Sequence, residues 1–202
     1  VVCRRQRQMC IRDRANTSAV FAGTNPNNGK RYVYLETLGG GMGARFTKDG
    51  KDGVQVHLTN TSNLPVEAIE MEYPLRVEEY SFVENSGGAG KYRGGLGIRR
   101  IIRPIAHKCE FSGVGERFKH SPWGVFGGQP GKPGKFYLKH KNGKITNLSS
   151  KSSSIYTNEN DAIVMETPGA GGYGNPKKRT KNNILKDKIS GKFSNSFLKK
   201  YY

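Results

Sequence analysis

Apolar and polar residues alternate over several short stretches of this 202-residue chain, as they do in half-buried β-strands. Gly, Pro and Asn separate these stretches, and Asn142-Gly143 is typical of a tight hairpin turn. The pattern predicts strands at Tyr32–Leu38, Val54–Leu58, Ile98–Ile105, Lys108–Val114, Lys135–Leu138, Lys144–Leu148, Ser154–Thr157 and Ala162–Thr167. Short strands at this spacing indicate a mainly β architecture.

Two stretches depart from the alternation. Residues 66–83 mix apolar and acidic positions, and Pro74 interrupts them, so they do not form one helix. Read as a strand, this stretch puts Glu70 and Glu72 on one face. The last ten residues place apolar side chains at helical spacing and predict a terminal helix, behind a basic linker that starts at Lys177. The predicted fold is mainly β with Gly-rich loops and a C-terminal helix.

Glycine is the most unusual feature of the composition, with 27 residues. Six glycines crowd around Arg93 within residues 87–97, and two explanations stand. They form tight turns between strands, or they leave backbone N–H groups free to bind an anion with Arg93 in reach. Residues 169–174 formally match the GxGxxG pattern, but Asn175-Pro176 follows where a nucleotide-binding motif needs a helix. We therefore predict no phosphate-binding loop in this chain.

The formal net charge of +18 at first favours a nucleic-acid-binding protein. Most of that excess lies at the two ends. Residues 1–14 carry +4 and residues 177–202 carry +8, which leaves +6 for residues 15–176. The aromatic residues of the basic tail have helical spacing rather than the interleaving that binds nucleic acid. A basic nucleic-acid-binding module is therefore the alternative, and nucleic acid is not the expected partner.

The first 14 residues look foreign to the rest of the chain. Arg4–Arg14 back-translates without a mismatch to the read-one adapter and transposon end of tagmentation sequencing libraries. We therefore predict that residues 1–14 are translated adapter and carry no information about the fold. Residues 15–176 form the β-rich region, and residues 177–202 form the basic linker and terminal helix.

The number of cysteines and the hydropathy of the chain indicate in which cellular compartment the protein is expected. Cys3 and Cys10 fall in the foreign segment, which leaves Cys109 as a small buried apolar residue. No disulfide framework or zinc spacing follows, and a reducing, cytoplasmic location is expected. No window approaches about 18 consecutive apolar residues, so no membrane span is predicted.

His57 and three nearby glutamates are the candidates for chemistry. His57 precedes the polar cluster Thr59–Asn63. It is either a half-exposed strand histidine or a site-facing imidazole suited to proton transfer. Glu67, Glu70 and Glu72 lie close to Arg76, either as a salt-bridged exposed face or as a source of one carboxylate base or metal ligand. No metal triad with recognisable spacing is present.

Six phrases, in order, resemble the carboxy-terminal part of the hydantoinase B/oxoprolinase family. They are GGGMGA (39–44), DGKDGVQVHLTNTSNLPVE (49–67), EYPLRVE (72–78), NSGGAGKYRGGLGIRR (85–100), PWGVFGGQPGKPG (122–134) and ETPGAGGYGNP (166–176). The resemblance runs from about residue 17 to the end of the chain. It implies the last third of a larger α+β subunit, so this chain is expected to be an inactive fragment.

The resemblance implies an ATP-dependent enzyme that opens cyclic amides such as 5-oxoproline or hydantoins. ATP with Mg is handled by a hydantoinase A-type subunit or domain, which agrees with the missing phosphate loop. Related complexes carboxylate ketones such as acetone and acetophenone, and this is the alternative reaction. A divalent metal is expected on residues upstream of this chain, with no metal site within it.

The family motif matches at eight positions: His57, Asn60, Thr61, Glu67, Tyr73, Arg76, Arg93 and Trp123. Among them, His57 and Glu67 are predicted to line the active cleft as the catalytic pair. Asn60, Thr61, Arg76 and Arg93 are predicted to bind substrate. Leu64 and Ala170 depart from the family's usual threonine and glycine, which puts the substrate preference in doubt.

Overall fold

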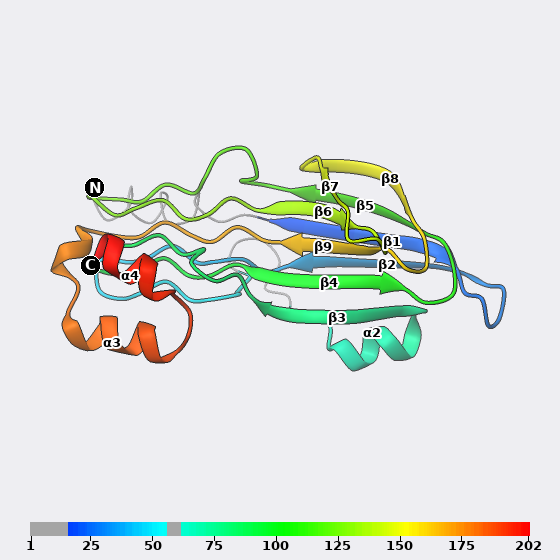
Figure 1. The fold of residues 1–202 in the computed structure, drawn as a ribbon, viewed down its shortest axis with the longest axis horizontal. Coiled ribbons are helices and arrows are strands. Elements are labelled where there is room, and N and C mark those ends of the chain that lie inside the picture. Colours follow the sequence, from blue (N-terminus) through cyan, green and yellow to red (C-terminus); the bar gives the residue numbers. More distant parts are fainter. Residues whose placement is uncertain (1–15, 56–61) are drawn as a thin grey trace.

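The computed structural model describes residues 16–55 and 62–202, and its strands form two antiparallel sheets (Figure 1). Sheet A has the strand order β2-β1-β5-β8. Its members are β1 (Thr17–Thr24), β2 (Arg31–Leu38), β5 (Cys109–Gly115) and β8 (Lys151–Thr157). Sheet B has the order β3-β4-β9-β6-β7. Its members are β3 (Leu75–Phe82), β4 (Ile98–Pro104), β6 (Lys135–Lys139), β7 (Ile145–Leu148) and β9 (Ala162–Glu166).

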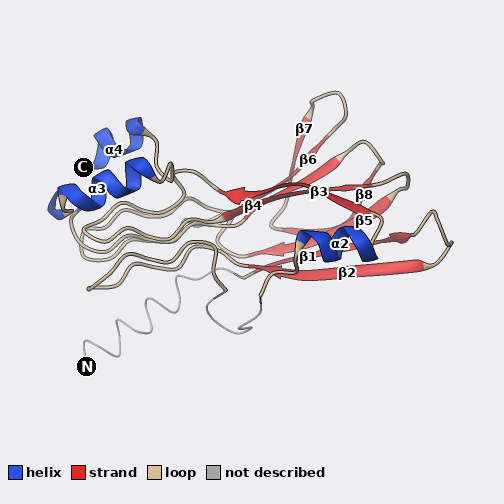
Figure 2. Ribbon diagram, turned by 90° about the horizontal axis from the view of Figure 1, so that it is seen from below, coloured by secondary structure: helices blue, strands red, loops and turns tan. Residues whose placement is uncertain are grey.

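The two sheets lie face to face, and their inward side chains form the larger core (Figure 2). Aromatic rings fill its centre. Phe111 lies 5.1 Å from Phe21 and 5.7 Å from Phe136, measured between ring centroids. Aliphatic side chains from both sheets, such as Leu38 of sheet A and Ile102 of sheet B, complete the packing. This half of the molecule is a β-sandwich held by apolar burial.

The prediction of a mainly β chain with a C-terminal helix is confirmed, with local corrections. β1 was not expected, because small residues weaken the alternation in Thr17–Thr24. Residues 66–83 form the helix α2 (Val66–Glu72) followed by β3. Glu70 and Glu72 therefore lie on a helix, not on one face of a strand, which corrects the expectation. Pro74 lies between helix and strand, as its missing N–H favours.

The glycine-rich segments form a separate part of the molecule. Residues 39–53, 83–97, 117–134 and 167–176, here called the glycine-rich lobe, run side by side away from the sandwich (Figure 1). Backbone hydrogen bonds join all four of them. The N–H of Gly95 donates to Met42 (2.9 Å), that of Ala170 to Gly95 (3.0 Å), and that of Gly172 to Gln129 (3.0 Å). Main chain packs against main chain here.

The close packing explains the glycine excess. A Cβ on Gly94 would lie 1.9 Å from the carbonyl oxygen of Ala170, and a Cβ on Gly95 would lie 1.9 Å from that of Lys51. Gly94 and Gly95 do not need a positive φ, since their backbone is not in the left-handed region. Of the two properties that glycine offers, positive φ and close backbone approach, the second explains these positions, rather than a turn or a free anion nest. The chain approaches itself too closely for a side chain, and the N–H groups of Gly88, Gly94 and Gly95 already donate to carbonyls.

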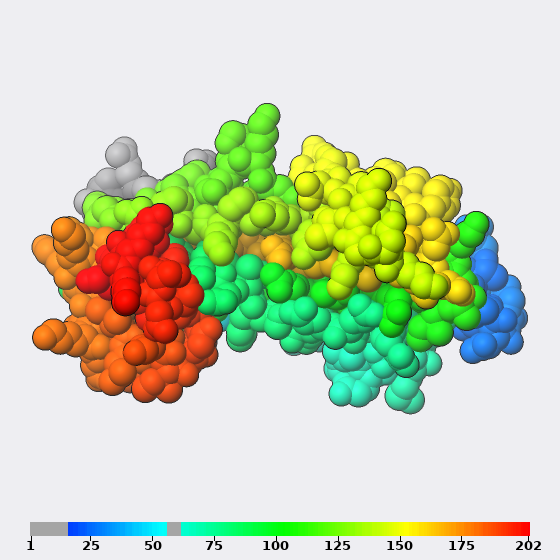
Figure 3. Space-filling model, viewed as in Figure 1, coloured from blue at the N-terminus to red at the C-terminus, as the bar shows by residue number. Residues whose placement is uncertain are grey.

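The C-terminal residues cap this lobe. After a short 3-10 turn, Pro176–Lys178, come α3 (Lys181–Ile189) and α4 (Asn195–Tyr201). Both helices lie at the end of the molecule far from the sandwich strands (Figure 3). The terminal helix was predicted, whereas α3 occupies most of the stretch read as a basic linker. Among the described residues, no helix has the length and hydropathy to cross a membrane.

Candidate functional site

The predicted site residues divide into two groups. His57, Asn60 and Thr61 fall outside the described residues, so their roles stay predictions. Glu67, Arg76 and Arg93 are described, and they lie in two different regions of the molecule.

The described chain on both sides of residues 56–61 is fixed by side-chain hydrogen bonds. Gln55 donates through Nε2 to the backbone carbonyl of Thr37 and to Oδ1 of Asn63 (3.1 Å). Asn63 donates in turn to the Tyr80 hydroxyl at 2.6 Å. These bonds join the two flanks to each other and to the edge strands β2 and β3. The segment that carries His57 therefore starts and ends at one place in the fold.

A buried ion pair lies next to these flanks. Arg100 on β4 is fully buried, and its Nη1 pairs with Glu36 of β2 across the two sheets. Tyr34 also donates its hydroxyl to Glu36, and burial together with this carboxylate raises the pKa of the Tyr34 phenol. The other carboxylate oxygen of Glu36 accepts the N–H of Leu64 at 2.9 Å. Glu36 thus links the core to the chain that follows residue 61.

Arg100 is only partly satisfied. Its Nε and Nη2 are buried without a hydrogen-bond partner. A buried donor left in this state costs about 1–3 kcal/mol. The ring of Tyr80 lies 4.3 Å from the guanidinium carbon and offsets part of that cost through a cation–π contact. Apolar side chains at this place would cost the fold less free energy than the partly unsatisfied Arg100. Buried polar groups that are unfavourable for stability are typical of functional regions.

Glu67 lies on α2 and Arg76 on β3. These two elements are neighbours at one side of the sandwich (Figure 2). Glu67 is an exposed residue in the first turn of α2, three positions after Leu64. Ile69 of the same helix is fully buried in the sandwich core and fixes the helix there. Arg76 is exposed at the start of β3. Both side chains are open to solvent. Glu67 lies near the end of α2 that follows residue 62, and Arg76 follows the other end of that helix.

Arg93 has a different environment. Its guanidinium is buried in the glycine-rich lobe, where Nη1 lies 2.8 Å from Oδ1 of Asp52 and Nε lies 3.1 Å from Oδ1 of Asp187. Nη1 also donates to the carbonyl of Gly94 at 3.1 Å. These carboxylates and hydrogen bonds hold the guanidinium in its charged form and raise the pKa of Arg93 against the opposing effect of burial. A substrate-binding role for Arg93 stays a prediction.

Arg179 completes this cluster from the C-terminal segment. It makes two hydrogen bonds of 2.8 Å to the carboxylate of Asp49 and lies 2.8 Å from Oδ2 of Asp187. Lys192 reaches Oδ2 of Asp52 at 2.8 Å. We call these six residues the ion cluster: Asp49, Asp52, Arg93, Arg179, Asp187 and Lys192. Three carboxylates balance three cations, as buried charges require.

The ion cluster lowers the pKa of two of its acids. Burial alone raises the pKa of Asp49, but hydrogen bonds and charge from Arg179 outweigh it and hold that pKa below 3.8. The pKa of Asp52 is lowered in the same way by Arg93 and Lys192. Both groups stay ionised at neutral pH. The cluster therefore fastens the C-terminal segment to the glycine-rich lobe.

Sequence reasoning did not assign Glu36, Arg100, Arg179 or Asp187 to a site, although all of them except Arg179 left a signal in the sequence. Glu36 and Arg100 have opposite charges and fall at the inward positions of two predicted strands. Asp187 is the one acidic residue in the basic tail, residues 177–202. A charged residue at an inward position of a strand predicts an oppositely charged partner elsewhere in the fold. A single acidic residue within a basic stretch predicts the same.

Neither a metal nor a nucleotide fits the described residues. Within 16–55 and 62–202, no group of three or more His, Cys, Asp or Glu side chains could hold a metal ion. The GxGxxG match at residues 169–174 uses its N–H groups internally: Gly169 donates to Lys132, Ala170 to Gly95 and Gly174 to Val125. A phosphate cradle needs these donors to be free. The glycines of this motif serve packing.

Comparison with known sequences places the chain in a family. The family model described as Hydantoinase B/oxoprolinase matches residues 6–176. An uncharacterized protein of Methanocaldococcus jannaschii is 48% identical over 166 residues, which is 82% of this chain and 29% of that protein. A Pseudomonas protein, named as one subunit of a putative D-/L-hydantoinase, is 35% identical over 85% of this chain and 29% of its own length. A Dictyostelium discoideum 5-oxoprolinase is 40% identical over 70% of this chain and 11% of its length.

Two solved structures share the fold. Nucleotide-free acetone carboxylase superposes with a TM-score of 0.75 at 18% identity, over 92% of this chain and 29% of its own. The ATP-dependent caprolactamase of Pseudomonas jessenii superposes with a TM-score of 0.70 at 22% identity, over 89% of this chain and 32% of its own. The chain thus spans between 11% and 32% of the length of these five proteins.

Proposed function

The chain belongs to the hydantoinase B/oxoprolinase family, and on that premise we propose that it is part of a subunit that hydrolyses cyclic amides at the expense of ATP. The family-model match over residues 6–176 is the observation that carries the proposal. The names of two relatives, a D-/L-hydantoinase and a 5-oxoprolinase, indicate a cyclic amide as the substrate class. The caprolactamase structure supports the same class, since caprolactam is a cyclic amide.

His57 and Glu67 are the proposed catalytic pair, and Asn60, Thr61 and Arg76 the proposed substrate-binding residues. Ring opening needs a base that takes the proton from the attacking water, and an imidazole or a carboxylate does this near neutral pH. The fixed flanks, Gln55 and Asn63, support the proposal because they hold both ends of the segment that carries His57. Glu67 begins α2 just beyond that segment, with its carboxylate open to solvent.

ATP and Mg are proposed to bind to a hydantoinase A-type partner subunit or domain rather than to this chain. The engaged N–H groups of residues 169–174 support this assignment. The Pseudomonas relative is named as one subunit of its enzyme, which supports a partner as well.

Carboxylation of a ketone is the second candidate reaction. The acetone carboxylase structure favours it, with a TM-score of 0.75 over 92% of the chain. Both acetone carboxylation and the caprolactamase are described as ATP-dependent. The two candidate reactions differ in the second reactant, which is water or bicarbonate.

The test uses the full-length subunit that carries this chain, co-expressed with a hydantoinase A-type subunit from the same source. We expect ATP-dependent turnover of 5-oxoproline, a hydantoin or caprolactam, with ring-opened product detected by mass spectrometry. Consumption of acetone or acetophenone only with bicarbonate would favour the carboxylase instead. Turnover of none of these compounds would contradict both candidates.

Two matched pairs of variants test the residues. We expect His57→Gln and Glu67→Gln to lower kcat by about 10²–10⁴, the usual contribution of a general acid or base. His107→Gln and Glu72→Gln are the controls, since neither is placed in the proposed site, and they should keep kcat within about twofold. Equal activity of Glu67→Gln and Glu72→Gln would remove Glu67 from the proposed pair.

A further inference from the structure

Two residues connect the buried Arg100 to the chain in front of α2. Nη1 of Arg100 pairs with Glu36, whose other carboxylate oxygen accepts the N–H of Leu64 at 2.9 Å. The guanidinium carbon lies 4.3 Å from the ring of Tyr80, whose hydroxyl accepts a hydrogen bond from Nδ2 of Asn63 at 2.6 Å. One buried cation therefore contacts both of the side chains that hold these two consecutive residues, 63 and 64.

The start of α2 has no capping side chain of its own. At α3 and α4 the N-cap side chains, Thr180 and Ser194, each accept a backbone N–H from the first turn of the helix. The N-cap of α2 is Pro65, and no side-chain hydrogen bond caps this helix. The carboxylate of Glu36 instead holds Leu64, the residue before the N-cap. The beginning of α2 is therefore fixed from a different strand.

Glu67 lies between two points at which this part of the chain is held. It follows Leu64 by three positions and precedes Ile69 by two. Ile69 is fully buried in the sandwich core and docks the middle of the helix. If the bond to Leu64 were lost, Ile69 would still dock the helix, but the first turn that carries Glu67 would be less restrained.

The stability of the sandwich gives no reason for a charge at this place. The inward neighbours of Arg100 on β4 are Ile98 and Ile102, so an apolar side chain would continue the pattern of the strand. Nε and Nη2 of Arg100 have no hydrogen-bond partner in the described part of the chain. Replacing a buried ion pair by apolar side chains of similar volume often leaves stability unchanged or raises it. The contacts toward residues 63 and 64 supply the reason that packing does not.

We propose that Glu36 and Arg100 are positioning residues, which hold the first turn of α2 so that the carboxylate of Glu67 keeps its place during the reaction. Both are buried, so they act through Leu64 and not by contact with the substrate. The proposal rests on the function proposed above, in which Glu67 belongs to the catalytic pair. A displacement of about 1 Å at a reacting group lowers a rate about 10²-fold, which sets the size of the effect.

The test replaces the buried polar group by apolar side chains of similar size in the full-length subunit, assayed with the A-type subunit. The triple variant combines Glu36→Leu and Arg100→Met with Tyr34→Phe, because the Tyr34 hydroxyl donates to Glu36. We expect the midpoint of its denaturant unfolding to equal or exceed that of the unsubstituted subunit, since no charge is left unpaired in the core. Its kcat should fall at least about tenfold, while KM stays within about threefold. The matched control, Arg99→Met with Glu166→Leu, removes a 2.6 Å ion pair on the outer face of sheet B and should keep kcat within about twofold.

Hydrogen exchange in the same full-length proteins follows the positioning without any assay of activity. The N–H of Leu64 loses its acceptor in the triple variant, so this amide should exchange at least about tenfold faster than in the unsubstituted subunit. The amide of Tyr73 donates to the carbonyl of Ile69 at the other end of α2, and its exchange rate should change less than about twofold.

Three results would overturn the proposal. They are an unchanged kcat in the triple variant, an equal loss of kcat in the Arg99–Glu166 control, and a fall in kcat that accompanies an equivalent fall in stability, since the last would make the pair structural. An unchanged exchange rate at Leu64 would overturn it as well, even if the unsubstituted enzyme turned over none of the candidate substrates. Absence of turnover in the unsubstituted enzyme is itself a result against the proposed function, and it is seen before any residue is replaced.

Discussion

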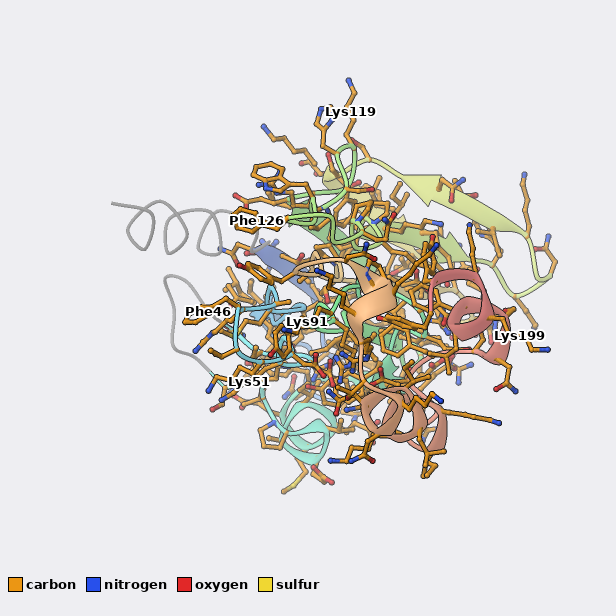
Figure 4. The ribbon with its side chains drawn as sticks, turned by 90° about the vertical axis from the view of Figure 1, so that its left-hand side faces the viewer. Phe46, Lys51, Lys91, Lys119, Phe126 and Lys199 are labelled. Atoms are coloured by element: carbon orange, nitrogen blue, oxygen red, sulfur yellow. The ribbon has the colours of Figure 1, made fainter. Side chains whose placement is uncertain are left out.

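The β-sandwich and the glycine-rich lobe are built by opposite means. In the sandwich, bulky side chains such as Phe111 and Phe136 fill the space between two sheets. In the glycine-rich lobe, backbone fills much of the space between segments, and only a few side chains such as Leu96 and Arg93 are buried. In the end-on view of Figure 4, Phe46, Lys119 and Phe126 lie at the rim of the molecule. The sandwich tolerates small losses of volume, whereas the lobe has no room for the gain of one methyl group.

The two regions also handle charge differently. The sandwich buries one ion pair, Glu36–Arg100, and leaves part of Arg100 unsatisfied. The glycine-rich lobe carries the six-residue ion cluster, in which Arg93, Arg179 and Asp187 are buried and the two arginines have carboxylate partners on two sides. A lobe with few apolar side chains depends on hydrogen bonds and ion pairs to fix its end. The partly satisfied pair of the sandwich lies instead beside the candidate site.

The largest expected effect comes from adding a methyl group to the lobe. In Gly94→Ala the new Cβ would lie 1.9 Å from the oxygen and 2.5 Å from the carbon of the Ala170 carbonyl. Both atoms belong to the backbone, so the segments must separate. We expect a loss of more than about 4 kcal/mol in the free energy of unfolding of the lobe. The single tryptophan, Trp123, lies in the lobe, so its fluorescence follows denaturant unfolding of this region.

Two controls sharpen this comparison. Ile102→Val changes the sandwich core by one methyl group in the opposite direction and should cost about 1 kcal/mol. Gly29→Ala places a methyl group where no heavy atom lies within 4 Å, at a φ of +67°, and should cost about 1 kcal/mol through backbone strain. If Gly94→Ala cost no more than these two substitutions, the backbone packing described for the lobe would be wrong.

The difference between the regions also explains what could be predicted from the sequence. The sandwich strands follow from alternation, since period-two burial of residues such as Ile98 and Ile102 is local information. The lobe does not, because glycines that permit close approach look the same in a sequence as glycines that permit a turn. The ion cluster joins Asp49 to Arg179 across 130 positions, and no local pattern carries such a pairing. The candidate site falls between these cases. Its segment was predicted from the motif and stays a prediction, and its buried neighbours, Glu36 and Arg100, appear only when two strands are placed face to face.

A second prediction concerns the attachment of the C-terminal helices. Asp187→Asn removes one charge from a carboxylate that contacts both Arg93 and Arg179, while the shape of the side chain is kept. Both cations would then lack part of their compensation in a buried place, which typically costs about 3–5 kcal/mol. We expect α3 and α4 to detach, so that limited proteolysis cleaves after Arg179 or at Lys181 before the sandwich unfolds. The control Glu159→Gln, at an exposed turn, should leave the rate of this cleavage unchanged. If Asp187→Asn were cleaved no faster than Glu159→Gln, the ion cluster would not fasten the helices to the lobe.

The smallest expected effect is that of mild acid, and its sign follows from the ion cluster. Asp49 and Asp52 have pKa values held below 3.8 in the folded protein, so near that pH the unfolded chain binds more protons than the folded one. The stability that they contribute is therefore complete at neutral pH, is retained at pH 5, and is lost as the pH falls through their folded pKa values. Denaturant unfolding followed by Trp123 fluorescence should show this loss as the pH falls below about 4, the ordinary pKa of an aspartate in the unfolded chain. The variant Asp49→Asn should be less stable at pH 7 and should lose less on acidification, because its side chain has no proton to bind. A sandwich signal from far-UV circular dichroism that fell before the Trp123 signal would reverse the comparison, since it would make the sandwich the acid-sensitive region.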